Sequence, residues 1–287
     1  MLEGIQTLCD KHFGSCDFTV MSDTNFSLEK ANESDLFVLG GGELINCDRL
    51  FMNRVAWDYP IKTRKIVVGC GLNNPDYVSL QDHVKRSLRR FQFIGVRDGE
   101  SYKLLREDPK LRDKVCLSLD PSLILPSKYG VAWKPMEGVV AVVPTDRKAN
   151  KYDLGILATN IIDQTKQRLL DQLKRDNAHL VILLAFGGDD NDDLANCRQL
   201  EGYLKDTYTV RVVKPSSPKE ALEILSACSK VYAYRLHGLI LAYALSIPFC
   251  GFGYHRKVKR NRDTLITLRN QDALWLMGKA WEQIAAN

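Results

Sequence analysis

Short apolar runs and helical stripes alternate along this chain. Residues 35–39 and 180–186 are apolar runs, and they predict strands that are buried on both faces. Between such runs the apolar residues recur three or four positions apart, as at 79–91, which predicts helices with one buried face. Repeated strand–turn–helix units of this kind predict an α/β fold built on parallel sheets.

The same pattern gives the expected order of elements. We expect strands at residues 17–21, 35–39, 65–69, 93–96, 115–119, 138–143, 180–186, 208–213, 231–234 and 248–252. We expect helices at residues 1–13, 27–32, 43–53, 79–91, 99–107, 154–174, 194–205, 218–227, 239–245 and 272–286. The basic segment 256–262 has little apolar content, so we expect a loop there.

A break in the pattern divides the chain. Residues 126–138 contain two prolines and two glycines without periodicity, so we interpret them as a linker. At 287 residues the chain is long for one core. We therefore expect Rossmann-like domains at residues 1–128 and 136–263, and a C-terminal helical segment at 264–287. A cleft between the two parallel sheets is the natural place for a site.

Composition and charge limit the classes of function. The chain is 45% apolar and 26% charged, which is ordinary for a soluble globular protein. Its 40 basic and 35 acidic residues give a net charge of +5, which fits an anionic small substrate and is too weak to indicate nucleic acid. No G-x-S-x-G elbow or H-E-x-x-H helix is present, which argues against the common hydrolases.

The eight cysteines favour a reducing compartment. They form no C-x-x-C pair and no metal-ligand spacing with histidine, and several lie in apolar runs where a free thiol behaves as a small hydrophobe. No segment has the character of a membrane-spanning helix, and the start shows no signal-peptide pattern. We therefore expect a cytoplasmic protein with no metal or cofactor.

Residues 230–245 carry the clearest candidate chemistry. A short strand is followed by a turn that contains Arg235 and His237, and then by an uncharged apolar helix; Gly238 is expected to let the backbone turn sharply between them. The two side chains would then lie at the carboxyl edge of a strand and the amino end of a helix, where α/β sheets bind anions. An arginine fork and a titratable imidazole there favour a phosphate or carboxylate substrate and proton transfer. The structural alternative is a paired arginine and a capped core histidine.

Other candidates follow other strands. Gly41 and Gly42 follow a strand directly, and their N–H groups could cradle a phosphate. Arg97 ends a strand and could point into the same cleft; a local pair with Asp98 is the structural alternative. Asp120 could cap a helix or orient a neighbour, and here the structural role is favoured.

Two charged segments in the second half leave alternatives open. Segment 187–193 is rich in oxygen ligands that would suit Mg²⁺ or Ca²⁺, but it lacks calcium-loop spacing, and such clusters commonly form turns and N-caps, which is the favoured interpretation. Lys257 and His255 follow a glycine turn and could reach the cleft, although His255 is more typical of a surface residue. The basic segment 256–262 could hold a diphosphate or contact a membrane surface, and the sequence favours neither.

The order and spacing of these motifs resemble the polysaccharide pyruvyl transferase family over roughly residues 1–260. In the first half, the matching segments are residues 35–42, 66–71, 94–98 with Ser101, Leu104 and Leu105, and 119–122. In the second half, they are residues 235–238 and 247–248, leading to Tyr254 and Lys257. Each motif is weak by itself, but their order is fairly specific.

The resemblance implies a GT-B-like protein with two Rossmann-like domains facing a cleft. Its members move the pyruvyl group of phosphoenolpyruvate onto a sugar as a ketal, with the histidine of the Arg-x-His motif as proton donor, here His237. The expected substrate-binding residues are Arg235, Arg97, Gly41, Gly42 and Lys257. The implied partners are phosphoenolpyruvate and a nucleotide- or lipid-linked sugar acceptor, with peripheral membrane contact left open.

One departure and two alternatives accompany the resemblance. Family members usually open with a strand and a Gly-Asp turn, whereas this sequence begins at the first helix, so we expect the N-terminal domain to lack that strand. A GT-B-like glycosyltransferase that uses a nucleotide sugar is the first alternative. A non-catalytic binding protein that retains the cleft is the second.

Overall fold

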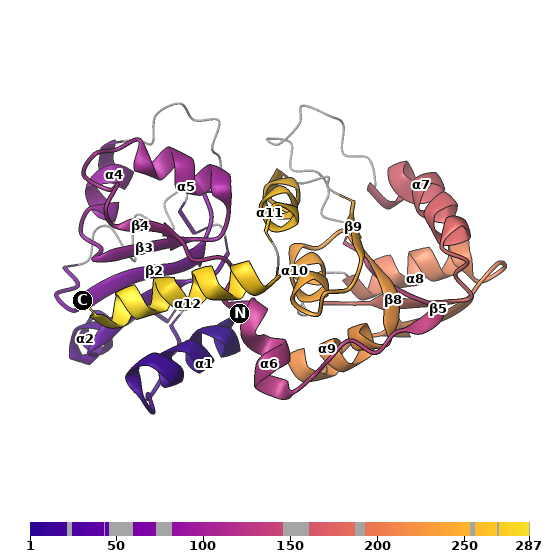
Figure 1. Ribbon diagram of the computed structural model, residues 1–287, viewed down its shortest axis with the longest axis horizontal. Helices are drawn as coiled ribbons and strands as arrows, with labels where there is room; N and C mark the ends of the chain where they lie inside the picture. The colour runs from indigo at the N-terminus through magenta and orange to yellow at the C-terminus, as the bar shows by residue number, and fades with distance from the viewer. Residues whose placement is uncertain are drawn as a thin grey trace. The chain divides into compact units, whose positions relative to one another are not determined.

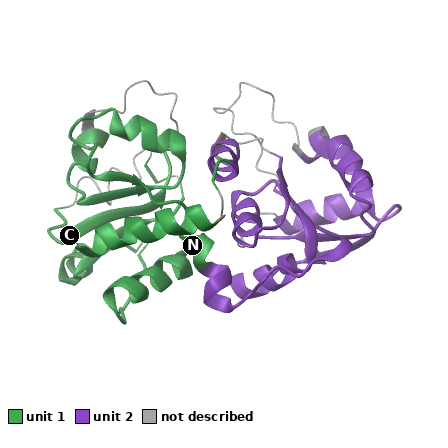
Figure 2. Ribbon diagram, viewed as in Figure 1, with its two compact units in different colours: residues 1–124, 267–287 green, residues 125–266 purple. Residues whose placement is uncertain are grey.

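The computed structural model describes residues 1–21, 25–42, 44–45, 60–72, 82–145, 161–186, 193–252, 256–268 and 270–286 (Figure 1). It divides into two compact units (Figure 2). Unit 1 comprises Met1–Ile124 and Thr267–Asn287, and unit 2 comprises Leu125–Ile266. Each unit contains a parallel sheet among its described residues, which confirms the predicted α/β class.

The described part of unit 1 contains a four-stranded sheet in the order β1-β2-β3-β4. Its strands are β1 (Leu36–Gly40), β2 (Arg64–Cys70), β3 (Phe93–Val96) and β4 (Val115–Leu117). Its helices are α1 (Leu2–Phe13), α2 (Leu28–Glu33), α4 (Asp82–Leu88), α5 (Gly99–Arg106), the 3-10 helix η2 (Pro121–Ile124) and α12 (Asn270–Ala286). Figure 1 shows α4 and α5 on one side of this sheet and α1 and α12 on the other.

Both faces of the unit 1 sheet are buried, as its continuous apolar strands require. On one face, Val67 and Ile94 of the strands pack in a cluster with Leu88 of α4. On the other, Leu8 of α1 and Trp281 of α12 are almost completely buried. The C-terminal helix therefore supplies part of the core of the N-terminal unit.

The described part of unit 2 contains a five-stranded parallel sheet in the order β7-β6-β5-β8-β9. Its strands are β5 (Met136–Val143), β6 (Leu180–Leu184), β7 (Thr209–Val213), β8 (Cys228–Ala233) and β9 (Phe249–Gly251). Its helices are α6 (Leu125–Tyr129), α7 (Ile161–Arg175), α8 (Asp193–Leu204), α9 (Pro218–Ser226), α10 (Leu236–Ala244) and α11 (Arg256–Ile266). Leu169 of α7 and Leu200 of α8 pack with Val140, Val181 and Tyr232 of the strands, so these helices cover one face of the sheet.

The expected strand at 17–21 is wrong. These residues join no sheet, and Phe18 and Val20 are 37% and 58% exposed. Among the described strands, β1 pairs with β2 alone and is an edge of its sheet. A five-residue run gains little by itself from an extended conformation when no strand lies beside it.

The expected loop at 256–262 is also wrong, because α11 covers these residues. Val258 and Leu265 lie two helical turns apart and are 1% and 4% exposed, and Arg260 is buried with them. Only two apolar residues mark the buried face, so the helical period is hidden among basic residues.

Other boundaries differ in detail from the sequence prediction. Within the expected linker 126–138, α6 occupies Leu125–Tyr129 and β5 begins at Met136. Between them, the N–H of Lys134 donates to the carbonyl of Ser226 at 2.9 Å, so this segment is held against the residues before β8. The expected helix at 43–53 lies almost entirely outside the described residues.

The cysteines of the described residues are free thiols. Burial raises the pKa of Cys70 and of Cys228 to about 12, so both stay protonated and behave as small apolar side chains. Within the described part of the chain, no helix combines the length and the apolar character needed to cross a membrane.

Candidate functional site

The strand order of unit 2 reverses between β5 and β8. From β5 the chain proceeds to β6 and β7 on one side, whereas β8 and β9 lie on the other side. Open α/β sheets bind ligands outside the carboxyl ends of their strands at such a switch point. Arg235 and His237 follow the end of β8 and open α10, so they lie at the switch point of this unit.

The amino end of α10 receives no cap from its own N-cap residue. That residue is Arg235, whose backbone is extended at φ −91° and ψ 139° and whose side chain makes no capping bond. A guanidinium has no acceptor atom, whereas Asp98 caps α5 and Ser217 caps α9 with side-chain oxygens. The first N–H groups of α10 are therefore suited to an anionic ligand.

Gly238 serves close packing rather than the expected sharp turn. It lies inside α10, and it is absent from the glycines with positive φ. A Cβ at this position would lie 2.9 Å from both Cβ and Cγ2 of Val143, the last residue of β5. The missing side chain thus lets the first turn of α10 approach the end of β5, which carries Arg235 and His237 to the same edge.

Asp193 is the charge partner of Arg235. Nη2 of Arg235 donates to Oδ1 of Asp193 at 2.6 Å, and Nε lies 2.5 Å from Oδ2 without the alignment of a hydrogen bond. Asp193 opens α8 and is 1% exposed, whereas the side chain of Arg235 is 20% exposed. The sequence interpretation missed this pair because 42 positions separate the two residues and Asp193 resembles the rest of its acidic segment.

The metal alternative for the acidic segment gains no support from Asp193, since its carboxylate already binds Arg235. Residues 187–192 lie outside the described part. Where the structure describes the chain, no group of three or more His, Cys, Asp or Glu side chains is arranged to hold a metal ion.

His237 is exposed on the first turn of α10, between the buried residues Leu236 and Gly238. Its exposure contradicts the alternative of a capped core histidine. An exposed imidazole beside an arginine, at the amino end of a helix, can exchange a proton with a bound anion.

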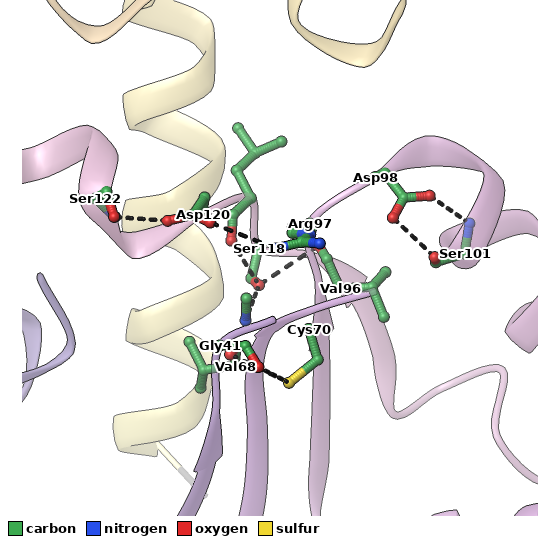
Figure 3. Close-up of polar contacts among 12 residues, drawn as sticks. Gly41, Val68, Cys70, Val96, Arg97, Asp98, Ser101, Ser118, Asp120 and Ser122 are labelled. Atoms are coloured by element: carbon green, nitrogen blue, oxygen red, sulfur yellow. Dashed lines mark hydrogen bonds and ion pairs between the residues drawn. The ribbon is translucent and has the colours of Figure 1, made fainter. Parts of the chain in front are cut away.

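Arg97 follows the end of β3 in unit 1 and is 3% exposed. Its Nη1 lies 3.9 Å from Oδ2 of Asp120, and its buried Nε has no hydrogen-bond partner among the described residues. The alternative of a local pair with Asp98 is wrong, because the Asp98 carboxylate accepts bonds from the N–H and the hydroxyl of Ser101, both at 2.9 Å (Figure 3). Arg97 is thus a buried cation with loose internal pairing.

Asp120 binds local backbone and also lies near Arg97. Its Oδ1 accepts a hydrogen bond from the N–H of Ser122 at 3.0 Å, and its Oδ2 faces Arg97 (Figure 3). The preceding residue, Leu119, has φ 58°, in the left-handed region that a leucine rarely adopts. Backbone strain of about 1–3 kcal/mol persists only where the surroundings fix the conformation, as at this strand end.

The remaining expected site residues are less well supported. The N–H of Gly41 donates to the carbonyl of Val68 at 3.2 Å, which argues against a phosphate cradle at that amide. The carbonyl of Gly42 accepts from the N–H of Gly71 at 3.0 Å. Lys257 lies in the first turn of α11, and its side chain is outside the described part.

A family model described as polysaccharide pyruvyl transferase matches residues 1–256. The chain belongs to the polysaccharide pyruvyl transferase family. The match confirms the resemblance seen in the sequence and extends over the residues of both strand ends, Arg97 in one unit and Arg235 with His237 in the other. Membership of this family implies that the protein is a transferase. No curated protein matches the chain in sequence.

Solved structures of UDP-GlcNAc 2-epimerases share the fold of this pyruvyl transferase family member. The enzyme from Methanocaldococcus jannaschii is 10% identical with a TM-score of 0.52, covering 98% of this chain and 88% of that one. A putative enzyme from Listeria monocytogenes is 9% identical with a TM-score of 0.54, covering 100% and 80%. The enzyme from Neisseria meningitidis is 11% identical with a TM-score of 0.54, covering 99% and 83%. At such identities the likeness shows the GT-B-like α/β fold alone.

Proposed function

We propose that this protein transfers the pyruvyl group of phosphoenolpyruvate to two hydroxyl groups of a sugar, which forms a ketal during surface-polysaccharide assembly. The observation that carries the proposal is the position of Arg235 and His237 at the switch point of unit 2, within a chain of the pyruvyl transferase family. A forked cation, an exposed imidazole and a helix end whose N-cap side chain makes no capping bond suit a small dianionic donor.

Arg235 is the proposed anchor for phosphoenolpyruvate, which carries a phosphate and a carboxylate. The guanidinium is not used to cap α10, and the N–H groups of the first turn point towards the same edge of the sheet. Each charged hydrogen bond from arginine to such an oxygen contributes about 1.5–3 kcal/mol.

His237 is the proposed acid. It protonates C3 of phosphoenolpyruvate, which makes C2 electrophilic. A sugar hydroxyl adds to C2 and phosphate leaves, and a second hydroxyl closes the ketal; the hydroxyl protons return to the histidine and to the released phosphate. A positioned acid contributes about 10²–10⁴-fold to such a step.

The acceptor is proposed to be a nucleotide- or lipid-linked sugar in the cytoplasm. Arg97, Gly42 and Lys257 remain proposed substrate contacts, of which Arg97 has the strongest support because its Nε has no internal hydrogen bond among the described residues. The start of α11 is basic, with Arg256 and Lys257 in its first turn, which suits a diphosphate-linked acceptor.

The test is a transfer assay with phosphoenolpyruvate and a panel of nucleotide- and lipid-linked sugars, in which ketal formation is detected by mass spectrometry. His237→Ala should reduce the rate by about 10²–10⁴-fold, because the acid is lost while an exposed side chain contributes little to the fold. His179→Ala is the matched control, since His179 is also exposed in unit 2 but lies before β6, at the opposite edge of the sheet. Full activity in His237→Ala would refute the proposed acid.

A further inference from the structure

We infer that Asp193 is a positioning residue, which holds the guanidinium of Arg235 in the orientation that binds an anion. The identity of the anion, phosphoenolpyruvate, rests on the proposed function. The orientation itself rests on the contacts between the two side chains.

The carboxylate of Asp193 lies along one edge of the guanidinium. Its oxygens face Nε at 2.5 Å and Nη2 at 2.6 Å, which together form the side edge of Arg235. The end edge, formed by Nη1 and the second N–H of Nη2, is not used by Asp193. A guanidinium can bind two oxyanions on different edges because its donors form a rigid planar fork. Asp193 therefore leaves the pair of N–H donors on the end edge of Arg235 for a ligand.

The two side chains differ in burial, which distinguishes the fixed carboxylate of Asp193 from the guanidinium of Arg235 that is proposed to bind the ligand. Asp193 is 1% exposed and opens α8, whose buried residues Cys197 and Leu200 fix that helix in the core of unit 2. Arg235 is the more exposed partner, with 20% of its side chain accessible. The carboxylate is thus fixed by the fold, and it restricts a long side chain that would otherwise lose rotamer freedom on binding.

Three possible roles of Asp193 predict different affinities of the Asp193→Asn variant for phosphoenolpyruvate. A positioning carboxylate predicts that Asp193→Asn weakens binding, because the guanidinium is no longer fixed before the ligand arrives. A carboxylate that competes with the ligand for Arg235 predicts tighter binding in the same variant. A carboxylate that only stabilises α8 predicts unchanged affinity with a lower melting temperature.

The experiment titrates phosphoenolpyruvate calorimetrically into the full chain and into Asp193→Asn, Asp193→Glu and Asp206→Asn, with melting temperatures recorded in parallel. Asp206→Asn removes an exposed negative charge from the same unit and is the matched control. We expect Asp193→Asn to bind at least about tenfold more weakly, the loss of roughly one charged hydrogen bond. Asp193→Glu should bind with intermediate affinity, and Asp206→Asn like the wild type. Equal or tighter binding by folded Asp193→Asn would overturn the inference.

A second readout does not depend on phosphoenolpyruvate. The rate at which phenylglyoxal modifies Arg235, mapped by peptide mass spectrometry, should rise in Asp193→Asn, because the guanidinium loses the carboxylate that holds it. An unchanged rate would overturn the positioning of Arg235. If the wild type fails to bind phosphoenolpyruvate, the proposed function fails, and the modification rate alone decides whether Asp193 fixes Arg235.

Discussion

At the scale of single residues, the two arginines that follow strands, Arg235 and Arg97, differ in how closely each pairs with a carboxylate. Arg235 lies within 2.6 Å of both oxygens of Asp193, whereas Arg97 lies 3.9 Å from Asp120. Arg97 is also the more deeply buried of the two, with 2% of its side chain exposed against 20%. Burying a cation with a loose partner is costly, so the pair with Asp120 offsets only part of the cost of burying Arg97.

The pairing of Arg97 can be tested by a double-mutant cycle. Arg97→Met removes the cation that faces the buried Asp120 carboxylate, and we expect a loss of roughly 1–3 kcal/mol in the free energy of unfolding. Arg97→Met combined with Asp120→Asn should lose less than the sum of the single changes. Urea unfolding measures all three, with the exposed Lys103→Met on α5 as control. Strict additivity would show that the two side chains do not interact.

At the scale of elements, the fit of α10 against β5 sets the geometry of the candidate site. Gly238→Ala would place a Cβ 2.9 Å from Val143, so the first turn of α10 must shift. We expect a loss of about 1–3 kcal/mol in stability together with weaker binding of phosphoenolpyruvate. Val143→Ala in the same chain should restore part of both.

Gly202 is the matched control for Gly238, since it also lies in a helix of unit 2 but nothing stands within 4 Å of an added Cβ. Gly202→Ala should raise the free energy of unfolding by about 0.5–1 kcal/mol through helix propensity. A Gly238→Ala variant that gains stability like Gly202→Ala would contradict the packing role.

The contact between α1 and α12 predicts that the stability of the protein depends on pH. His12 stacks on Trp281 with ring centroids 6.2 Å apart, and burial together with the charge of Lys11 lowers the pKa of His12, against an opposing effect of Glu282. The unfolded chain therefore binds this proton more tightly than the folded one. Stability is unaffected above the ordinary pKa of 6.5 and falls as the pH drops from there through the lowered pKa.

His12→Phe should keep the ring stack and remove this titration. We expect a smaller loss of stability between about pH 7 and about pH 5 than in the wild type. Urea midpoints at the two pH values measure the difference, and His179→Phe is the control on an exposed histidine. An identical pH dependence in His12→Phe and wild type would contradict the account of α1 and α12.

Most elements could be predicted from the sequence because their apolar pattern is local. Both sheets consist of apolar runs, and the strand–helix unit that contains His237 follows from its residues alone. The failures lie where the pattern misleads. Residues 17–21 alternate but join no sheet, and the buried face of α11 includes Arg260 and Asn261 beside its apolar residues. The role of Gly238 was also missed, because a close approach to Val143 depends on a strand far away in the sequence.

At the scale of the whole molecule, the sequence could not show which strands are neighbours. The reversal between β5 and β8 determines that Arg235 lies at a switch point, and it arises from pairings across the entire second half of the chain. The pair of Asp193 and Arg235, and the packing of α12 in unit 1, are non-local in the same way. The family resemblance supplied the chemistry, whereas the fold supplied the partner of the key arginine.

The proposed donor site of this protein is the Arg-x-His element of unit 2, which we expect to bind phosphoenolpyruvate. The test is calorimetric titration of the full chain with phosphoenolpyruvate and, separately, with UDP. The titrations compare wild type, Arg235→Ala and the control Arg198→Ala. Arg198 lies in the same unit, and its side chain is 63% exposed. We expect that wild type and Arg198→Ala bind phosphoenolpyruvate and that Arg235→Ala binds it at least about tenfold more weakly. Binding of UDP alone would favour a nucleotide-sugar enzyme. If the wild type bound neither ligand, or if Arg235→Ala bound phosphoenolpyruvate as tightly as the wild type, Arg235 would not be the donor-binding residue.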